Sequence, residues 1–323
     1  MKQYSALCCY FGKWPNHFQA WLSSCKYNVG IDFYLVTDIS ASGFDVPHNV
    51  HIVEMSFAEV VQLVRSKFPN VEISLSTPYK LCDFKTAYGY IFDHIFSNYS
   101  YWGFFDIDTI WGNILNFVPE NSDSHLVRIF PCGHLSFIRN VAPYNKIFEM
   151  VNSVAGTLCR NNMAGKRVVT WQECFASSQN YYYDEEGGLE PLITSDTKLC
   201  RQSYLKVDFD NILPPWRFRH FLSINFPEKS RFLGYDFSPG TLQRVYLKRF
   251  SLRKEAIPYV HFPKRELLVS TPDVSEYSII PNRFIDRKCW TIFSLMWHCR
   301  PRYLFHFFQR CKRKIKKLLW HSA

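Results

Sequence analysis

Two aspartates one residue apart, Asp106 and Asp108, follow the apolar run Tyr101–Phe105. In open α/β sheets, ligands bind beyond the carboxyl ends of the strands, which is where this pair falls. Two neighbouring carboxylates repel each other unless a cation lies between them, and carboxylate oxygens suit Mg²⁺ or Mn²⁺. We therefore expect Asp106 and Asp108 to hold a divalent metal ion. An ordinary Asp-x-Asp turn is the structural alternative.

Two kinds of chemistry use such an acidic pair. Phosphoryl transfer by an aspartate nucleophile usually has Asp-x-Asp-Gly-Thr on the first strand of the core, whereas here Thr109 and Ile110 follow a pair that comes late in the chain. Glycosyl transfer from a nucleotide sugar uses the metal to bridge the pair and the diphosphate, and the late position favours it. A Mg²⁺-dependent phosphohydrolase and a non-catalytic glycan-binding protein remain the alternatives.

The elements that must position this pair alternate between strands and helices. The expected strands are Ser5–Tyr10, Ile31–Thr37, Val50–Val53 and Tyr101–Phe105, and the expected helices are Asn16–Lys26, Phe57–Lys67 and Cys82–Phe96. Such alternation with nearly continuous apolar strands predicts an α/β protein with a Rossmann-type core, its central sheet mostly parallel and flanked by helices.

The pattern is looser after Pro119. It predicts short strands at Leu126–Phe130, Leu135–Ile138, Leu205–Val207 and Ile257–Val260, with helices at Tyr144–Val151 and Val168–Ser177. We expect one catalytic domain over residues 1–285 and a separate C-terminal segment over residues 286–323.

The chain resembles nucleotide-sugar glycosyltransferases of the GT-A type and, more narrowly, the bacterial polysaccharide-biosynthesis family DUF6625. The resemblance covers most of residues 5–265. The motifs that carry it are Tyr10-Phe-Gly-Lys-Trp-Pro15, Leu35-Val-Thr-Asp38, Pro78-Tyr-Lys-Leu-Cys-Asp-Phe-Lys85, Trp102-Gly-Phe-Phe-Asp-Ile-Asp108 and Gly133-His-Leu-Ser136. It implies a GT-A-like core and a hexosyltransferase that moves a sugar, from a UDP-linked donor, onto a growing surface glycan such as a capsule, an O-antigen or an exopolysaccharide. The acceptor would be lipid-linked.

The resemblance also assigns roles to individual residues. His261 would be the third ligand of Mn²⁺ or Mg²⁺ beside Asp106 and Asp108, and Lys264 would contact the diphosphate. The other donor-binding positions would be Tyr10, Phe11, Gly12, Asp38, Lys80, Asp83, Lys85 and Ile107. The sugar or acceptor pocket would include Gly133, His134 and Ser136.

Two acidic residues in a polar turn, Asp184 and Glu185, are candidates for the group that deprotonates the acceptor hydroxyl. An inverting enzyme needs such a base, whereas a retaining enzyme does not. The segment His261-Phe-Pro-Lys264 resembles the late motif of retaining enzymes and slightly favours retention. Each of these residues also has an ordinary structural alternative, such as a strand-end turn, a helix-terminal charge pair or a solvated loop.

The net charge of +10 is concentrated at the end of the chain. Residues 300–323 carry eight Lys and Arg side chains and no acid, so the rest of the chain is nearly neutral. On a helix, Leu304, Phe308, Cys311, Ile315, Leu318 and Leu319 form one apolar stripe. A basic amphipathic helix fits an anionic membrane surface. Packing of the stripe on the protein body and binding to nucleic acid are the alternatives, and we expect no nucleic-acid partner.

Composition excludes several other classes of protein. A chain with 47% hydrophobic and 20% charged residues is neither disordered nor collagen-like. The sequence has no run of 18 apolar residues, so we expect no transmembrane helix. The first residues, Met1-Lys2-Gln3-Tyr4, lack the pattern of a signal peptide. The eleven cysteines form no C-x-x-C pair, which predicts reduced, mostly buried thiols. We therefore expect a cytoplasmic protein, peripheral at the inner face of the cytoplasmic membrane.

Overall fold

The computed structural model of the chain describes residues 3–118, 127–130, 133–150, 153–154, 168–181, 204–205, 230–248, 251–262, 267–271, 274–280 and 283–286. These residues form a mixed α/β protein. The chain divides into two compact units, the first made of Met1–Pro15, Asn28–Thr109 and Ile114–Val207, the second of Asn16–Tyr27, Ile110–Asn113 and Asp208–Ala323. The predicted segment 286–323, with its basic amphipathic helix, lies outside the described residues except for Asp286, so that boundary stays a prediction.

A seven-stranded sheet organises the first unit, in the order β10-β6-β7-β4-β1-β2-β3. Its strands are β1 (Tyr4–Cys9), β2 (Ile31–Thr37), β3 (Val50–Glu54), β4 (Tyr101–Phe105), β6 (Arg128–Ile129), β7 (Leu135–Arg139) and β10 (Tyr204–Leu205). β1 pairs in parallel with β2 and β4, β2 with β3, and β10 with β6. β7 runs antiparallel to β4 and β6, so the sheet is mainly parallel, as predicted, but partly antiparallel.

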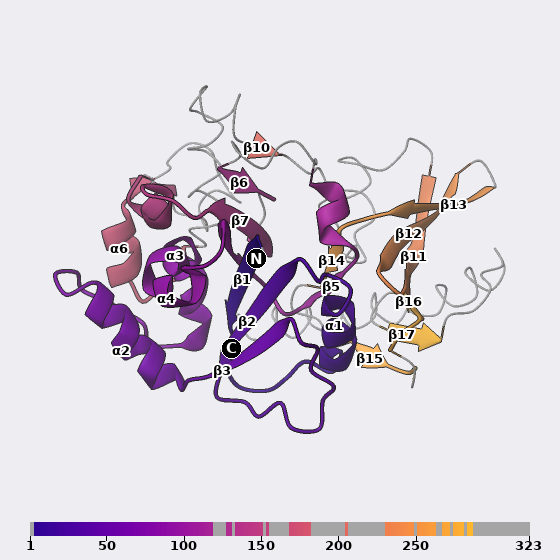
Figure 1. Cartoon of the computed structure of the whole chain (residues 1–323), viewed down its shortest axis with the longest axis horizontal. Coiled ribbons are helices and arrows are strands. Elements are labelled where there is room, and N and C mark those ends of the chain that lie inside the picture. Colours follow the sequence, from indigo (N-terminus) through magenta and orange to yellow (C-terminus); the bar gives the residue numbers. More distant parts are fainter. Residues whose placement is uncertain are drawn as a thin grey trace, which may run out of the picture. The chain divides into compact units, whose positions relative to one another are not determined.

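The central strands are apolar because both of their faces are covered. Every residue of β4 is buried, which is typical of a strand inside a helix-covered sheet. Helix α2 (Phe57–Lys67) begins at Ser56 with a capping box, in which Ser56 and Glu59 bond each other's backbone amides, and it buries Val60 and Val64. Figure 1 shows α2, α3, α4 and α6 gathered beside this sheet, and all four helices contribute buried side chains to one hydrophobic core cluster.

The prediction of one helix over Cys82–Phe96 is wrong. The segment consists of the 3₁₀ helix η1 (Pro78–Ala87) followed by two single-turn helices, α3 (Tyr88–Ile91) and α4 (Asp93–Phe96). A 3₁₀ helix has about three residues per turn, so side chains three apart point the same way. Lys80 and Asp83, three residues apart, therefore lie on the same side of η1 and form a buried ion pair.

Beyond residue 119, where the sequence pattern is weaker, the two predicted helices differ from their predictions. The predicted helix at Tyr144–Val151 is a 3₁₀ helix, η3 (Tyr144–Met150), and the predicted helix at Val168–Ser177 divides into β9 (Val168–Val169) and α6 (Trp171–Ala176). α6 begins at a second capping box, Thr170 with Glu173. β9 pairs with β8 (Ser153–Val154), and η2 (Ile114–Phe117) is a further 3₁₀ turn.

The second unit contains a six-stranded sheet that the sequence did not reveal. Its order is β13-β12-β11-β16-β17-β15, with strands β11 (Ser230–Ser238), β12 (Thr241–Lys248), β13 (Ser251–Ala256), β15 (Leu268–Val269), β16 (Tyr277–Ile280) and β17 (Arg283–Asp286). Neighbouring strands of this sheet pair antiparallel, except β15 and β17, which pair in parallel. The unit also contains helix α1 (Phe18–Cys25), which begins two residues later and ends one residue earlier than the predicted helix Asn16–Lys26.

Two of the other sequence predictions can be compared with the fold. Within the described ranges, no helix is both long and apolar enough to cross a bilayer. Cys8, Cys25 and Cys174 are buried free thiols, as predicted, and burial raises the pKa of the half-buried Cys9 thiol to about 12.

Candidate functional site

The acidic pair leaves β4 in a tight turn. The amide of Asp106 donates to the carbonyl of His134 at 3.2 Å, which extends the ladder between β4 and β7 by one residue. The Thr109 hydroxyl donates to the carbonyl of Asp106 at 2.7 Å and closes the turn. Ile107 is 4% exposed, whereas both aspartates are half-buried. The apolar side chain at the apex is thus anchored inside, and the two carboxylates on either side of it reach the surface of the turn.

A short ladder brings a histidine to this turn. Asp108 directly precedes β5 (Thr109–Trp111), which pairs with β14 (Tyr259–His261) in a two-stranded sheet. The amide of Gly112 donates to the carbonyl of Pro258 at 2.8 Å, and a Cβ at Gly112 would lie 2.5 Å from the carbonyl oxygen of Ile257. Only glycine allows the strands to approach so closely here.

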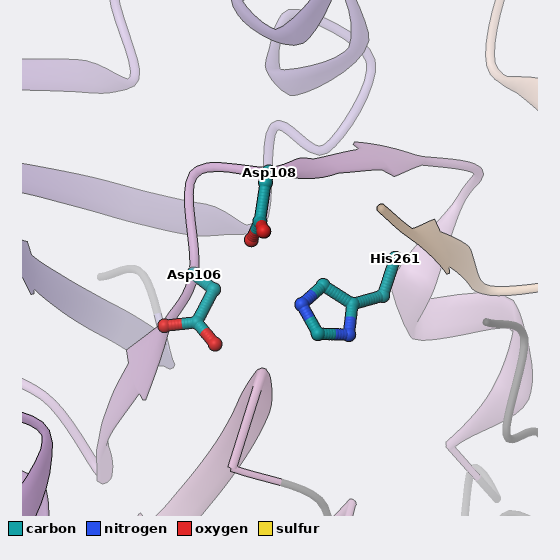
Figure 2. A group of neighbouring side chains, drawn as sticks. All are labelled: Asp106, Asp108 and His261. Carbon is teal, nitrogen blue, oxygen red and sulfur yellow. The ribbon is translucent and has the colours of Figure 1, made fainter. Parts of the chain in front are cut away.

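Asp106, Asp108 and His261 each offer one ligand atom, and these atoms lie within 4.8 Å of one another. Figure 2 shows the imidazole ring and both carboxylates around a common space. Two carboxylate oxygens and one imidazole nitrogen are donors that suit Mn²⁺, and Mg²⁺ through the carboxylates. The residues present therefore fit the predicted metal, although metal binding stays a prediction.

Lys85 is tied to the first of the two aspartates. Its ammonium donates to Oδ1 of Asp106 at 2.8 Å and to the carbonyl of Gly133 at 2.9 Å. It also lies 5.8 Å from the centre of the Phe104 ring. The Lys85 side chain is 6% exposed and that of Asp106 is 26% exposed. The resemblance had assigned Lys85 to the donor, whereas these contacts join its ammonium group to Asp106, Gly133 and the Phe104 ring.

Lys80 and Asp83, predicted as donor-binding residues, form a buried pair. The Lys80 ammonium donates to Oδ2 of Asp83 at 2.7 Å and to the carbonyls of Cys174 and Gln179 at 2.8 and 2.6 Å. These three acceptors use all three donors of an ammonium group. Both oxygens of Asp83 also accept from the amide of Tyr181. These contacts favour a structural role, in which the pair fixes η1 to residues 174–181.

The residues after β1 and β2 lie at the same edge of the sheet, because β1, β2 and β4 are parallel. Tyr10 stacks on Trp14 at 5.6 Å and donates to the carbonyl of Lys13 at 2.9 Å. Burial, and then electrostatic repulsion from Cys8 and Asp108, raise the pKa of the Tyr10 phenol. Gly12, with φ +107°, has the left-handed conformation that favours glycine.

The two other predicted residues at this edge differ in burial. Asp38 is exposed directly after β2, which suits the predicted contact with a ribose. Phe11 is half-buried, packs edge-on against Phe57 at 5.6 Å and contacts the core cluster, which favours a structural role. The donor-binding role of each stays a prediction.

The predicted sugar or acceptor residues lie in strand β7 or directly before it: Ser136 is in β7, and Gly133 and His134 precede it. Gly133 and His134 contribute the carbonyls that bind Lys85 and the amide of Asp106, and both residues are buried. Ser136 is fully buried and accepts from Nε of Arg128 at 2.7 Å. Arg128 was not predicted from the sequence. It is the single charged residue in the otherwise apolar run Leu126–Phe130, and a charge at such a position indicates a buried polar contact. Asp184, Glu185 and Lys264 lie outside the described residues.

Two comparisons with known proteins complete the description of the site. A family model described as a family of unknown function (DUF6625) matches residues 6–288. That range contains every candidate site residue named above. No curated protein matches the sequence.

Proposed function

The chain belongs to the DUF6625 family, and since the function of that family is unknown we propose a function from the site itself. We propose that the protein is a metal-dependent glycosyltransferase of the GT-A type, which moves a sugar from a nucleotide donor, such as a UDP-sugar, onto a growing surface glycan. The observation that carries the proposal is the convergence of Asp106, Asp108 and His261 at the carboxyl end of a central strand. The mainly parallel sheet supports it, because such sheets bind ligands at this edge.

The proposed chemistry needs charge stabilisation at a leaving diphosphate. A bound Mn²⁺ or Mg²⁺ would supply this by balancing the charge that develops on the phosphate oxygens. Lys264, on the segment that follows β14, would hold the same phosphates by its ammonium group. Tyr10 and Asp38, at the ends of β1 and β2, would contact the base and the ribose.

The acceptor hydroxyl must lose its proton as the new glycosidic bond forms and the bond between sugar and phosphate breaks. If the configuration is inverted, Asp184 or Glu185 would take that proton; if it is retained, an oxygen of the leaving phosphate would take it. We slightly favour retention, because the segment His261-Phe-Pro-Lys264 resembles the late motif of retaining enzymes.

A panel of nucleotide sugars tests the proposal. We expect at least one UDP-sugar to raise the midpoint of thermal denaturation when Mn²⁺ is present and to have a much smaller effect when EDTA replaces the metal. Incubation with that donor and Mn²⁺ should release UDP, measured by chromatography. Turnover of a phosphate ester through an aspartyl-phosphate would instead identify a phosphohydrolase. A shift without any turnover on a panel of glycan acceptors would favour a glycan-binding or scaffold protein.

We propose in addition that residues 300–323 hold the enzyme at an anionic membrane surface, where lipid-linked acceptors are built. Replacing Lys312, Arg313, Lys314, Lys316 and Lys317 with glutamine should abolish pelleting with vesicles of phosphatidylglycerol and phosphatidylcholine, since each charge contributes about 1 kcal/mol near such a surface. Vesicles of phosphatidylcholine alone should not pellet even the unaltered protein. Equal pelleting of the altered and unaltered proteins would contradict this role of the tail.

A further inference from the structure

Lys85 is placed to control the charge of the proposed metal site. We propose that Lys85 is a positioning residue that tunes the site to accept a divalent cation together with a diphosphate in preference to the cation alone. This inference rests on the proposed function and deepens it. It differs from the direct contact with the donor that the sequence had suggested for Lys85, because the ammonium acts through Asp106.

The ammonium of Lys85 is fixed from several sides. It donates to Oδ1 of Asp106 at 2.8 Å and to the carbonyl of Gly133 at 2.9 Å, and the Phe104 ring lies 5.8 Å away. With 6% of its side chain exposed, Lys85 is not a solvated lysine that meets Asp106 by chance. In a 3₁₀ helix, residues two apart point in different directions, so Asp83 can turn to Lys80 while Lys85 turns to Asp106.

This contact orients the carboxylate of Asp106. One oxygen, Oδ1, is held by Lys85, and a carboxylate has a second oxygen that can bind a cation. Figure 2 shows one oxygen of Asp106 on the side of His261 and the other on the opposite side. Through Gly133, the same lysine also ties the segment before β7 to this carboxylate.

The contact also sets the charge of the site. Among these four residues, Asp106 and Asp108 contribute two formal negative charges and Lys85 returns one positive charge, while an imidazole that binds a cation through its nitrogen must be neutral and adds none. A divalent cation therefore leaves the site with a net positive charge, which attracts a diphosphate. Without Lys85, the same cation would only neutralise the two carboxylates. The lysine thus opposes binding of the cation alone and favours binding of the diphosphate that follows it.

Replacing Lys85 with methionine should therefore change two affinities in opposite directions. We expect the dissociation constant for Mn²⁺ alone to fall several-fold, because a competing cation has been removed, and the dissociation constant for UDP in saturating Mn²⁺ to rise about tenfold or more. Lys85→Arg keeps the positive charge, so its dissociation constants for Mn²⁺ and for UDP should both stay close to those of the unaltered protein. Isothermal titration calorimetry on the full chain, with Mn²⁺ alone and then with UDP, measures these constants.

The control is Lys67→Met, which removes a lysine that pairs with Asp93 at 2.7 Å and should leave both affinities unchanged. A purely structural role of Lys85 would lower both affinities in Lys85→Met together with the midpoint of thermal denaturation, and that result would overturn the inference. Equal Mn²⁺ affinity in Lys85→Met and the unaltered protein would overturn it as well, while leaving the proposed function standing. If the unaltered protein binds neither Mn²⁺ nor UDP, the proposed function fails and this inference with it.

Discussion

Replacing Asp108 with asparagine is expected to lower metal-dependent turnover of the nucleotide-sugar donor by at least about 10²- to 10³-fold, the range seen when one preorganised charge-stabilising group is lost. Asparagine has nearly the same shape but no charge, so it weakens a cation ligand without leaving a cavity. Of the two aspartates, Asp108 gives the more specific test of metal binding. Replacing Asp106 would also remove the acceptor of the Lys85 ammonium group and so change two interactions at once.

The measurement is release of the nucleoside diphosphate, with calorimetric titration of Mn²⁺ as an independent reading. Mn²⁺ affinity should fall with turnover, and the midpoint of thermal denaturation without metal should stay close to that of the unaltered protein. Asp93→Asn is the matched control, since Asp93 is half exposed, pairs with Lys67 and lies in α4, away from the acidic pair in sequence. Full turnover in Asp108→Asn would refute the metal role of this aspartate.

Sequence patterns identified the elements whose burial is regular along the chain. Ile31–Thr37, Tyr101–Phe105 and Phe57–Lys67 begin and end at the predicted residues, because apolar runs and helical spacing reflect which face each element buries. The acidic pair was found for the same reason, since it directly follows the most apolar of these strands.

Other features depend on contacts between distant parts of the chain. The 3₁₀ helix η1 depends on carbonyls of Cys174 and Gln179, far along the sequence, that receive the Lys80 ammonium. His261 lies beside Asp108 because two three-residue strands pair, and strands so short leave little pattern. The antiparallel sheet of the second unit was missed partly because edge strands such as β13 are mostly exposed and carry charged residues.

Lys80 differs from Lys85, the proposed positioning residue, because its ammonium group is held in a buried ion pair with Asp83, and stability should show the difference. Lys80→Met would leave the Asp83 carboxylate buried without its cation and would remove a donor from two carbonyls. Removing one partner of a buried ion pair typically costs about 3–5 kcal/mol in the free energy of unfolding. For a chain of this size, that loss corresponds to a fall of about 4–7 °C in the midpoint of thermal denaturation.

Lys67→Met supplies a matched comparison within the same protein. Lys67 and Asp93 are as close as Lys80 and Asp83, 2.7 Å in both pairs, but their side chains are 23% and 52% exposed rather than 1% and 0%. Because solvent screens the exposed pair, Lys67→Met should cost about 1 kcal/mol or less. Urea denaturation followed by tryptophan fluorescence measures both variants. If Lys80 served only to bind the donor, Lys80→Met would match Lys67→Met in stability and lose affinity for the nucleotide sugar instead.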